Sequence, residues 1–188
     1  LEGMSRIEDA AQLYIGAANW EGLTGLIVKN ARTLLAEGRS RTLEDWLQRF
    51  PEDFLHRHSW LLYWMGSCLL MVNPAEARKH FEGAYDLFTG EGDGSGLFLS
   101  WSSIVDTYMY EWRDFHPLDH WIEEMESLWG RYRDFTSRET KDRVTCSMFS
   151  ALMFRQPHHP DLPEWQAKAQ AVMHSTPDET LKISIGNN

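Results

Sequence analysis

Apolar side chains recur three and four residues apart through nearly the whole chain, and polar side chains fill the positions between them. Sustained alternation of apolar and polar residues, which is typical of half-buried strands, does not occur in the sequence. The pattern predicts an all-α fold of amphipathic helices joined by short turns. The expected helices cover about residues 6–17, 19–35, 42–50, 59–72, 73–88, 97–112, 117–129, 136–152 and 161–172.

Short polar signals mark the expected helix ends. Side chains that can cap a helix start stand at Asn19, Thr42, Asn73, Thr136 and Asp161. Pro74 follows Asn73 at the first helical position, and Gly38 is a C-cap signal. The glycine-rich segment 89–96, "TGEGDGSG", is predicted to be a linker.

Two stripes in the second half of the chain are rich in tryptophan. The first is predicted to form one helical face from Trp101, Ile104, Val105, Tyr108 and Trp112. After Pro117, the second is predicted to face inward with Leu118, Trp121, Ile122, Met125, Leu128 and Trp129.

The segment from Ser59 to Val72 carries no charged side chain. Because a bilayer-spanning helix needs about 20 apolar residues, this run predicts a buried helix and no membrane span. The first residues, Leu1 to Ser5, show neither the basic nor the apolar region of a secretion signal.

The net charge restricts the expected partners, and the cysteine content indicates the compartment. The chain has 28 acidic and 18 basic residues and a net charge of −10, which disfavours direct contact with nucleic acid or with anionic membranes. Cys68 and Cys146 lie in apolar helical segments, so we expect buried, reduced thiols and a cytoplasmic protein.

The helices recur in pairs at tetratricopeptide-like spacing, at about 20–50, 59–88, 97–129 and 136–173. In the pair 59–88, Ala77, Phe81 and Ala84 match the second-helix pattern, and Gly66 provides the small residue at which the two helices should cross. This predicts a single domain over residues 1–188, built as a right-handed superhelix, or solenoid, of antiparallel helix pairs. A further start signal at residues 176–179, "TPDE", indicates a fragment of a longer array, with a short terminal cap as the alternative.

The segment "NWEGLTGLIVKNARTLLAEGRSRTLEDWLQRFPEDF" resembles the helical repeat region of MalT-like, LuxR-type ATP-dependent transcriptional regulators. The family's "LL..GR..TL..WL..P" pattern is matched at Leu34-Leu35, Gly38-Arg39, Thr42-Leu43, Trp46-Leu47 and Pro51, and the resemblance covers about residues 6–130. The chain has neither a GxxxxGK[ST] phosphate loop nor a basic recognition helix, so it departs from the complete regulator.

The resemblance implies a non-catalytic sensor or scaffold segment that binds a small inducer, a peptide or a regulatory protein, and that can self-associate through its repeats. A free-standing tetratricopeptide adaptor for protein–protein contacts is the first alternative, and a helical enzyme domain is the second.

Aligning the helix pairs on Gly66 predicts a groove for a ligand or partner. We expect its walls to be Trp60, Tyr63, Ser67 and Leu70 in one helix and Leu99, Ser102, Asp106 and Met109 in another. The alternative is that Trp60 and Tyr63 pack against the preceding helix.

No motif predicts a cofactor, a metal site or a catalytic residue. The histidines at 56, 58, 116, 120, 158 and 159 are expected to be solvated turn residues, because no cysteine or carboxylate joins them at a recognised ligand spacing. The segment 89–96 lacks the lysine of a phosphate loop. The carboxylates of Asp106, Glu111, Asp114 and Asp119 are expected to form a solvated edge and caps.

Overall fold

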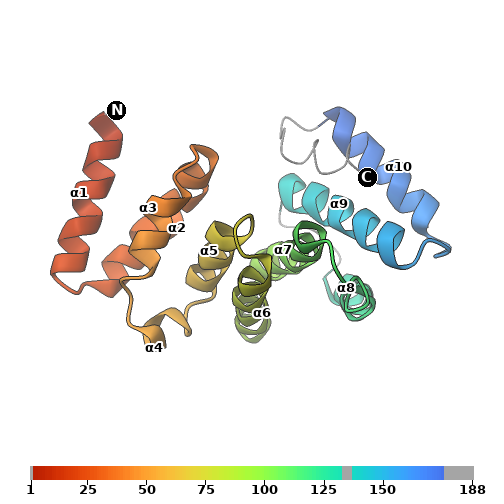
Figure 1. The fold of residues 1–188 in the computed structure, drawn as a ribbon, viewed down its shortest axis with the longest axis horizontal. Helices are drawn as coiled ribbons and strands as arrows, with labels where there is room; N and C mark the ends of the chain where they lie inside the picture. The colour runs from red at the N-terminus through yellow and green to blue at the C-terminus, as the bar shows by residue number, and fades with distance from the viewer. Residues whose placement is uncertain (1, 133–136, 176–188) are drawn as a thin grey trace. The chain divides into compact units, whose positions relative to one another are not determined.

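The computed structural model describes residues 2–132 and 137–175 of the chain, and these residues form helices and turns with no strand among them (Figure 1). The all-α prediction is therefore confirmed. The helices are α1 (Glu2–Gly16), α2 (Trp20–Ala36), α3 (Ser40–Leu47), α4 (Glu52–Leu55), α5 (Ser59–Leu69), α6 (Pro74–Glu91), α7 (Gly94–Glu111), α8 (Leu118–Arg131), α9 (Arg138–Arg155) and α10 (Leu162–Ser175).

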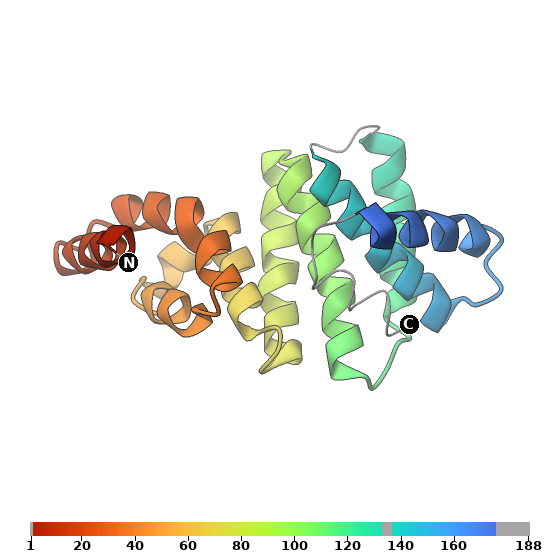
Figure 2. The ribbon, with the colours of Figure 1, turned by 90° about the horizontal axis from the view of Figure 1, so that it is seen from above.

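The chain, predicted from the sequence to be one domain, divides into two compact units, unit 1 (Leu1–Leu87) and unit 2 (Phe88–Asn188). In unit 1, α2 contacts α1, α3 and α5. In unit 2, α9 contacts α7, α8 and α10, and α10 crosses α9 (Figure 2). Within each unit, helices therefore pack mainly against others that are close in sequence.

Three of the predicted helix-end signals are confirmed. The Asn19 side chain accepts a hydrogen bond from the Gly22 amide at 2.9 Å, and Asn73 accepts one from the Glu76 amide at 3.3 Å, as predicted. Gly38, with a φ of 73°, follows α2 as the expected left-handed residue.

Two predicted start signals are misplaced. α3 begins at Ser40 after Arg39, so Thr42 lies inside the helix and does not cap it. Thr136 lies outside the described residues, and the hydroxyl of Ser137 accepts the capping hydrogen bond from the Thr140 amide at 3.1 Å. The signal at 176–179 also lies outside the described residues.

The predicted linker over residues 89–96 is wrong. α6 continues to Glu91 and α7 begins at Gly94, so only two residues connect the helices. Gly92 takes a φ of 72°, and the Asp93 carboxylate accepts hydrogen bonds from the amides of Ser95 and Gly96, both at 3.0 Å. The segment is thus a tight turn followed by an N-cap.

In unit 1, the crossing of α5 and α6 follows the sequence prediction. Phe81 and its neighbours Ala77 and Ala84 are fully buried, and a Cβ placed on Gly66 would lie 2.8 Å from the Phe81 ring. Because even a methyl group would overlap that ring, glycine at position 66 permits the close approach of the two helices.

In unit 2, Trp101 is fully buried, and its indole Nε1 donates a hydrogen bond to the Trp121 carbonyl at 2.7 Å. Trp112 does not extend this buried face as predicted. It ends α7 with a left-handed φ of 49° and is 60% exposed. Its ring packs edge-on against Phe115 and Phe154 instead.

No helix in the parts that the structure describes has both the length and the apolar character needed to cross a bilayer. The uncharged run from Ser59 forms α5, whose residues Leu61 to Gly66 are all buried. This agrees with the prediction of a buried helix.

Cys68, on α5, is buried, and burial together with the charge of Glu44 raises the pKa of its thiol to about 12. At about pH 8, its thiolate fraction is therefore about a thousandth of that of an ordinary thiol. We expect iodoacetamide to alkylate Cys68 at least about a hundredfold more slowly in the folded protein than in urea. Mass spectrometry of the peptide containing Cys68 measures both rates, and equal rates would contradict the burial.

Candidate functional site

The predicted groove residues of α5 are only partly accessible. Tyr63 is 3% exposed and lies against Phe81, with ring centroids 5.6 Å apart, so it does not line an open groove wall. Trp60 is half-buried and stacks on Trp64, with centroids 6.1 Å apart. Ser67 and Leu70 are half-buried, and the Ser67 hydroxyl donates a hydrogen bond to the Tyr63 carbonyl at 2.8 Å. Tyr63 is therefore buried, and its ring contact with Phe81 joins it to α6, the following helix.

The remaining predicted groove residues lie on α7, in unit 2. Leu99 is 7% exposed and Ser102 is fully buried, so neither faces solvent as expected. Met109 and Asp106 are half-buried. The predicted groove residues therefore form two sets, one on α5 in unit 1 and one on α7 in unit 2.

Asp106 connects α7 to α9 through side-chain contacts. Its carboxylate accepts hydrogen bonds from the Arg143 guanidinium at 3.1 Å and from the Ser147 hydroxyl at 3.3 Å. Burial raises the pKa of Asp106, and the contacts with Arg143 and Ser147 oppose that rise. Because both of its carboxylate oxygens are hydrogen-bonded, Asp106 has a structural role and stabilises the packing of α7 against α9.

The histidines near α8 do not form a metal centre with Asp106. His116 contacts Asp114, whose carboxylate lies 3.0 Å from the His116 amide and 2.7 Å from its Nδ1. These two hydrogen bonds lower the pKa of Asp114. Within the described ranges, no three histidine, cysteine or acidic side chains are grouped closely enough to hold a metal ion.

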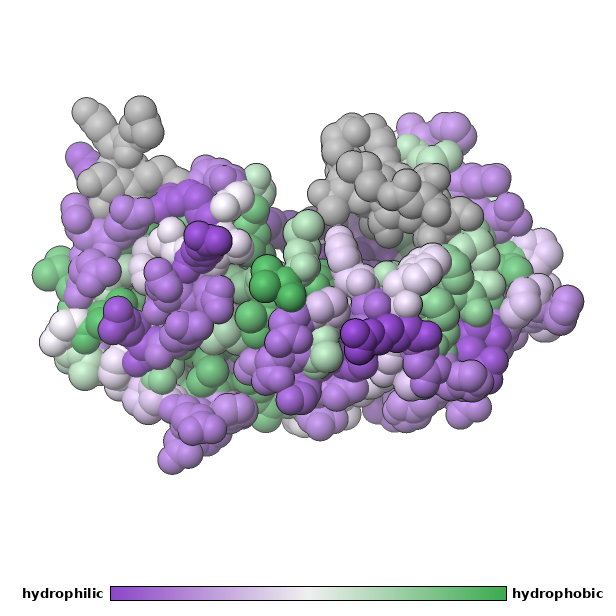
Figure 3. Space-filling view, viewed as in Figure 1, coloured by the Kyte–Doolittle hydropathy of each residue, from purple (hydrophilic) through white to green (hydrophobic). Residues whose placement is uncertain are grey.

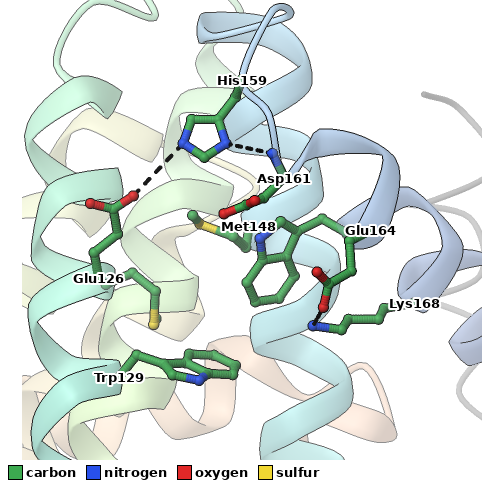
Figure 4. Close-up of a pocket in the computed structure, with 9 residues that line it drawn as sticks. Glu126, Trp129, Met148, His159, Asp161, Glu164 and Lys168 are labelled. Carbon is green, nitrogen blue, oxygen red and sulfur yellow. Dashed lines mark hydrogen bonds and ion pairs between the residues drawn. The ribbon is translucent and has the colours of Figure 1, made fainter.

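A pocket of about 300 Å³ lies in unit 2 among α8, α9, α10 and the turn that precedes α10 (Figure 4). The lining combines aromatic, thioether and charged side chains. They are Met125, Glu126, Trp129, Met148, His159, Asp161, Glu164, Trp165 and Lys168. This volume is at the lower end of the range for small-molecule sites.

Helix geometry explains why these side chains meet. On α8, Trp129 lies four residues after Met125 and three after Glu126, so its side chain is a helical neighbour of each. Asp161 immediately precedes α10, and on that helix Lys168 lies four residues after Glu164 and three after Trp165. Met148, from α9, is 2% exposed and provides an apolar surface between these two sets of side chains.

Two indoles form the aromatic part of the pocket. The ring centroids of Trp129 and Trp165 lie 5.4 Å apart, and their planes meet at 86°. Trp165 is 9% exposed, whereas Trp129 is 39% exposed. Trp129, predicted to face inward, therefore presents part of its ring to solvent at the pocket.

The polar groups lie around these rings. The Asp161 amide donates a hydrogen bond to Nδ1 of His159 at 3.2 Å. In the neutral imidazole, the proton is therefore on Nε2, which lies 3.7 Å from the Glu126 carboxylate (Figure 4). On the other side, the Lys168 ammonium lies 2.6 Å from Glu164 and 4.6 Å from the centroid of Trp165.

Sequence reasoning missed this pocket. The sequence pattern predicts Asp161 only as a capping residue and places Trp129 in the core. The signal present in the sequence is the set Asp161, Glu164, Trp165 and Lys168 on one helical face. That face lines a pocket only when α10 packs beside α8 and α9, and the sequence does not specify how these helices pack.

Comparison of the chain with protein-family models, with curated proteins and with solved structures finds no match.

Proposed function

We propose that this chain is a non-catalytic binding segment that holds a small ligand in the pocket lined by Trp129 and Trp165. The observation that carries the proposal is the pocket itself: an apolar floor, two indoles and a few charged groups that converge on one space. Ligand sites have this composition, with apolar walls for affinity and few polar groups for orientation.

We further propose that the segment serves as the sensor part of a MalT-like, LuxR-type transcriptional regulator in the cytoplasm. Support comes from the resemblance over about residues 6–130 and from the close contact of Gly66 with Phe81, which suits a tetratricopeptide-like helix pair. In this proposal, successive pairs stack as a right-handed solenoid, and ligand binding changes how the repeats contact a protein partner or another copy.

A free-standing adaptor is a second candidate, and an exposed apolar turn favours it. Met71 and Val72, between α5 and α6, are 78% and 83% exposed, and hydrophobic surface gathers over this turn (Figure 3). Apolar side chains at an exposed turn can contact a partner protein. An adaptor would bind peptides at such a surface and would not need the pocket.

A thermal-shift screen with metabolites and short peptides tests the proposed function. A pocket ligand at about 100 times its Kd should raise the Tm by about 5–10 °C. The shift should persist in Trp112→Ala and disappear in Trp129→Ala, because Trp112 is the more exposed of the two and lies outside the pocket lining. Mass spectrometry of each hit after incubation should find it chemically unchanged.

The screen separates the candidates. Hits that survive Trp129→Ala and are lost in Met71→Ser would favour the adaptor. If no compound shifts the Tm in a way that depends on Trp129, the pocket proposal is wrong. Turnover of a hit would favour an enzyme.

A further inference from the structure

We propose that the pocket selects a small organic cation of the alkylammonium class, which places its charged head against the Trp129 ring between Glu126 and Asp161. This inference rests on the proposed binding function and specifies the chemistry of the ligand. The evidence for it is the charge of the pocket lining, the geometry of the two indoles and the position of Lys168.

The charge of the lining favours a cation. Glu126, Asp161 and Glu164 contribute three carboxylates, whereas Lys168 contributes one ammonium group. An anionic ligand would be repelled, and a neutral polar ligand would gain no net Coulomb attraction from these carboxylates. A cation would reduce the net charge of the pocket.

Lys168 shows how this pocket accommodates an ammonium group. Its Nζ lies over the Trp165 ring, 4.6 Å from the centroid, and 2.6 Å from Glu164. An indole face attracts a cation through its quadrupole, and a nearby carboxylate adds Coulomb attraction. The α10 side of the pocket therefore already contains a cation–indole–carboxylate arrangement.

The α8 side of the pocket also offers an indole and a carboxylate. Trp129 is 39% exposed, and Glu126 is three residues before it on α8. The Glu126 carboxylate is 3.7 Å from His159, too far for a strong hydrogen bond, so a ligand can compete for it. Figure 4 shows Glu126, Asp161 and Trp129 around the same space, with Asp161 on the turn side.

Size also restricts the ligand. A space of about 300 Å³ suits a compact ammonium ion more than a peptide or an oligosaccharide. Quaternary ammonium groups are recognised by indole rings together with carboxylates, because their charge is spread over methyl groups and they cost little to desolvate. Choline is a suitable probe of this chemistry.

Titrations with choline and with its uncharged carbon isostere dimethylbutanol test the inference. Nitrogen-edited NMR of the tryptophan indoles reports binding, and assignment by Trp129→Leu identifies the Trp129 signal. We expect choline to shift the indole signals of Trp129 and Trp165 with a Kd of about 1 mM or tighter. The isostere should bind at least about tenfold more weakly.

Matched variants test whether choline binds in the pocket or is only attracted by the acidic surface of the chain. Glu126→Gln and Trp129→Leu should each weaken choline binding by about threefold to tenfold. Glu123→Gln is the control, because Glu123 is also exposed on α8 but does not line the pocket. It should bind choline as the unmodified chain does.

The possible failures are distinguishable. Equal binding of choline and the isostere, or loss of binding in Glu123→Gln to the same degree, would overturn cation selectivity. If choline does not bind but a neutral or anionic screening hit depends on Trp129, the ligand class is wrong and the binding function stands. If no ligand depends on Trp129, both proposals fail.

Discussion

Replacing Trp101 with alanine is expected to lower the free energy of unfolding by about 3–5 kcal/mol, the largest effect we predict for any single substitution. Trp101 is fully buried in unit 2, so its removal leaves a cavity that α7 cannot fill by itself. The substitution also removes the hydrogen bond from its Nε1 to the Trp121 carbonyl, 2.7 Å away on α8. Urea denaturation followed by circular dichroism measures the change.

Two further variants divide this effect into its parts. Trp101→Phe keeps an aromatic ring in the core but loses the hydrogen bond, and should cost about 1–2 kcal/mol. Trp112→Ala removes an indole that is 60% exposed, and should cost less than about 1 kcal/mol. If Trp101→Ala were no more destabilising than Trp112→Ala, the placement of Trp101 in the core would be wrong.

The helices were predictable because their signals are local. Asn19 and Asn73 cap the helices that their sequence positions indicate, since a cap depends only on the next three residues. The error at 89–96 has a local cause as well. Four glycines indicated a flexible linker, but Asp93 caps α7 and lets Gly94 and Gly96 join the helix.

Burial was less predictable where a helix is covered on several sides. Ser102 was expected to face a groove from the alignment of the helix pairs on Gly66, yet it is fully buried. Residues 96–105 of α7 are all buried, so no polar stripe separates a core face from a solvent face. The polarity of a serine does not indicate its exposure on such a helix, because a small hydroxyl fits between packed helices.

The pocket was not predictable from the sequence because it depends on how three helices pack. Trp129 was counted with the inward stripe of α8, of which Leu128 is 3% exposed and Trp129 is 39% exposed. One residue along a helix changes direction by about 100°. Whether the last member of a stripe is buried therefore depends on the neighbouring helix, and in this chain α10 leaves room beside Trp129.

Replacing Gly66 with alanine is expected to destabilise unit 1 by about 1–3 kcal/mol, although alanine is the better helix former. The added Cβ would lie 2.8 Å from the Phe81 ring. That ring is fully buried and packs against Tyr63, so it has little room to move. The steric cost should therefore exceed the helix-propensity gain of about 1 kcal/mol.

Gly25→Ala provides the matched control. Gly25 lies in the interior of α2, it is exposed, and its added Cβ would have nothing within 4 Å beyond its chain neighbours and the backbone of its own helix. The same substitution should therefore stabilise the protein there, by about 0.5–1 kcal/mol. Urea denaturation of the two variants should give changes of opposite sign, because only position 66 is at a helix crossing.

A double variant identifies the clash as the cause. Phe81→Leu alone should destabilise the protein, because it removes part of a fully buried ring. Combined with Gly66→Ala, it makes room for the new methyl group, so the two costs should sum to more than the cost of the double variant, by at least about 0.5 kcal/mol. Additive costs would mean that Gly66 and Phe81 are not in contact, and the proposed tetratricopeptide-like crossing of α5 and α6 would lose its main support.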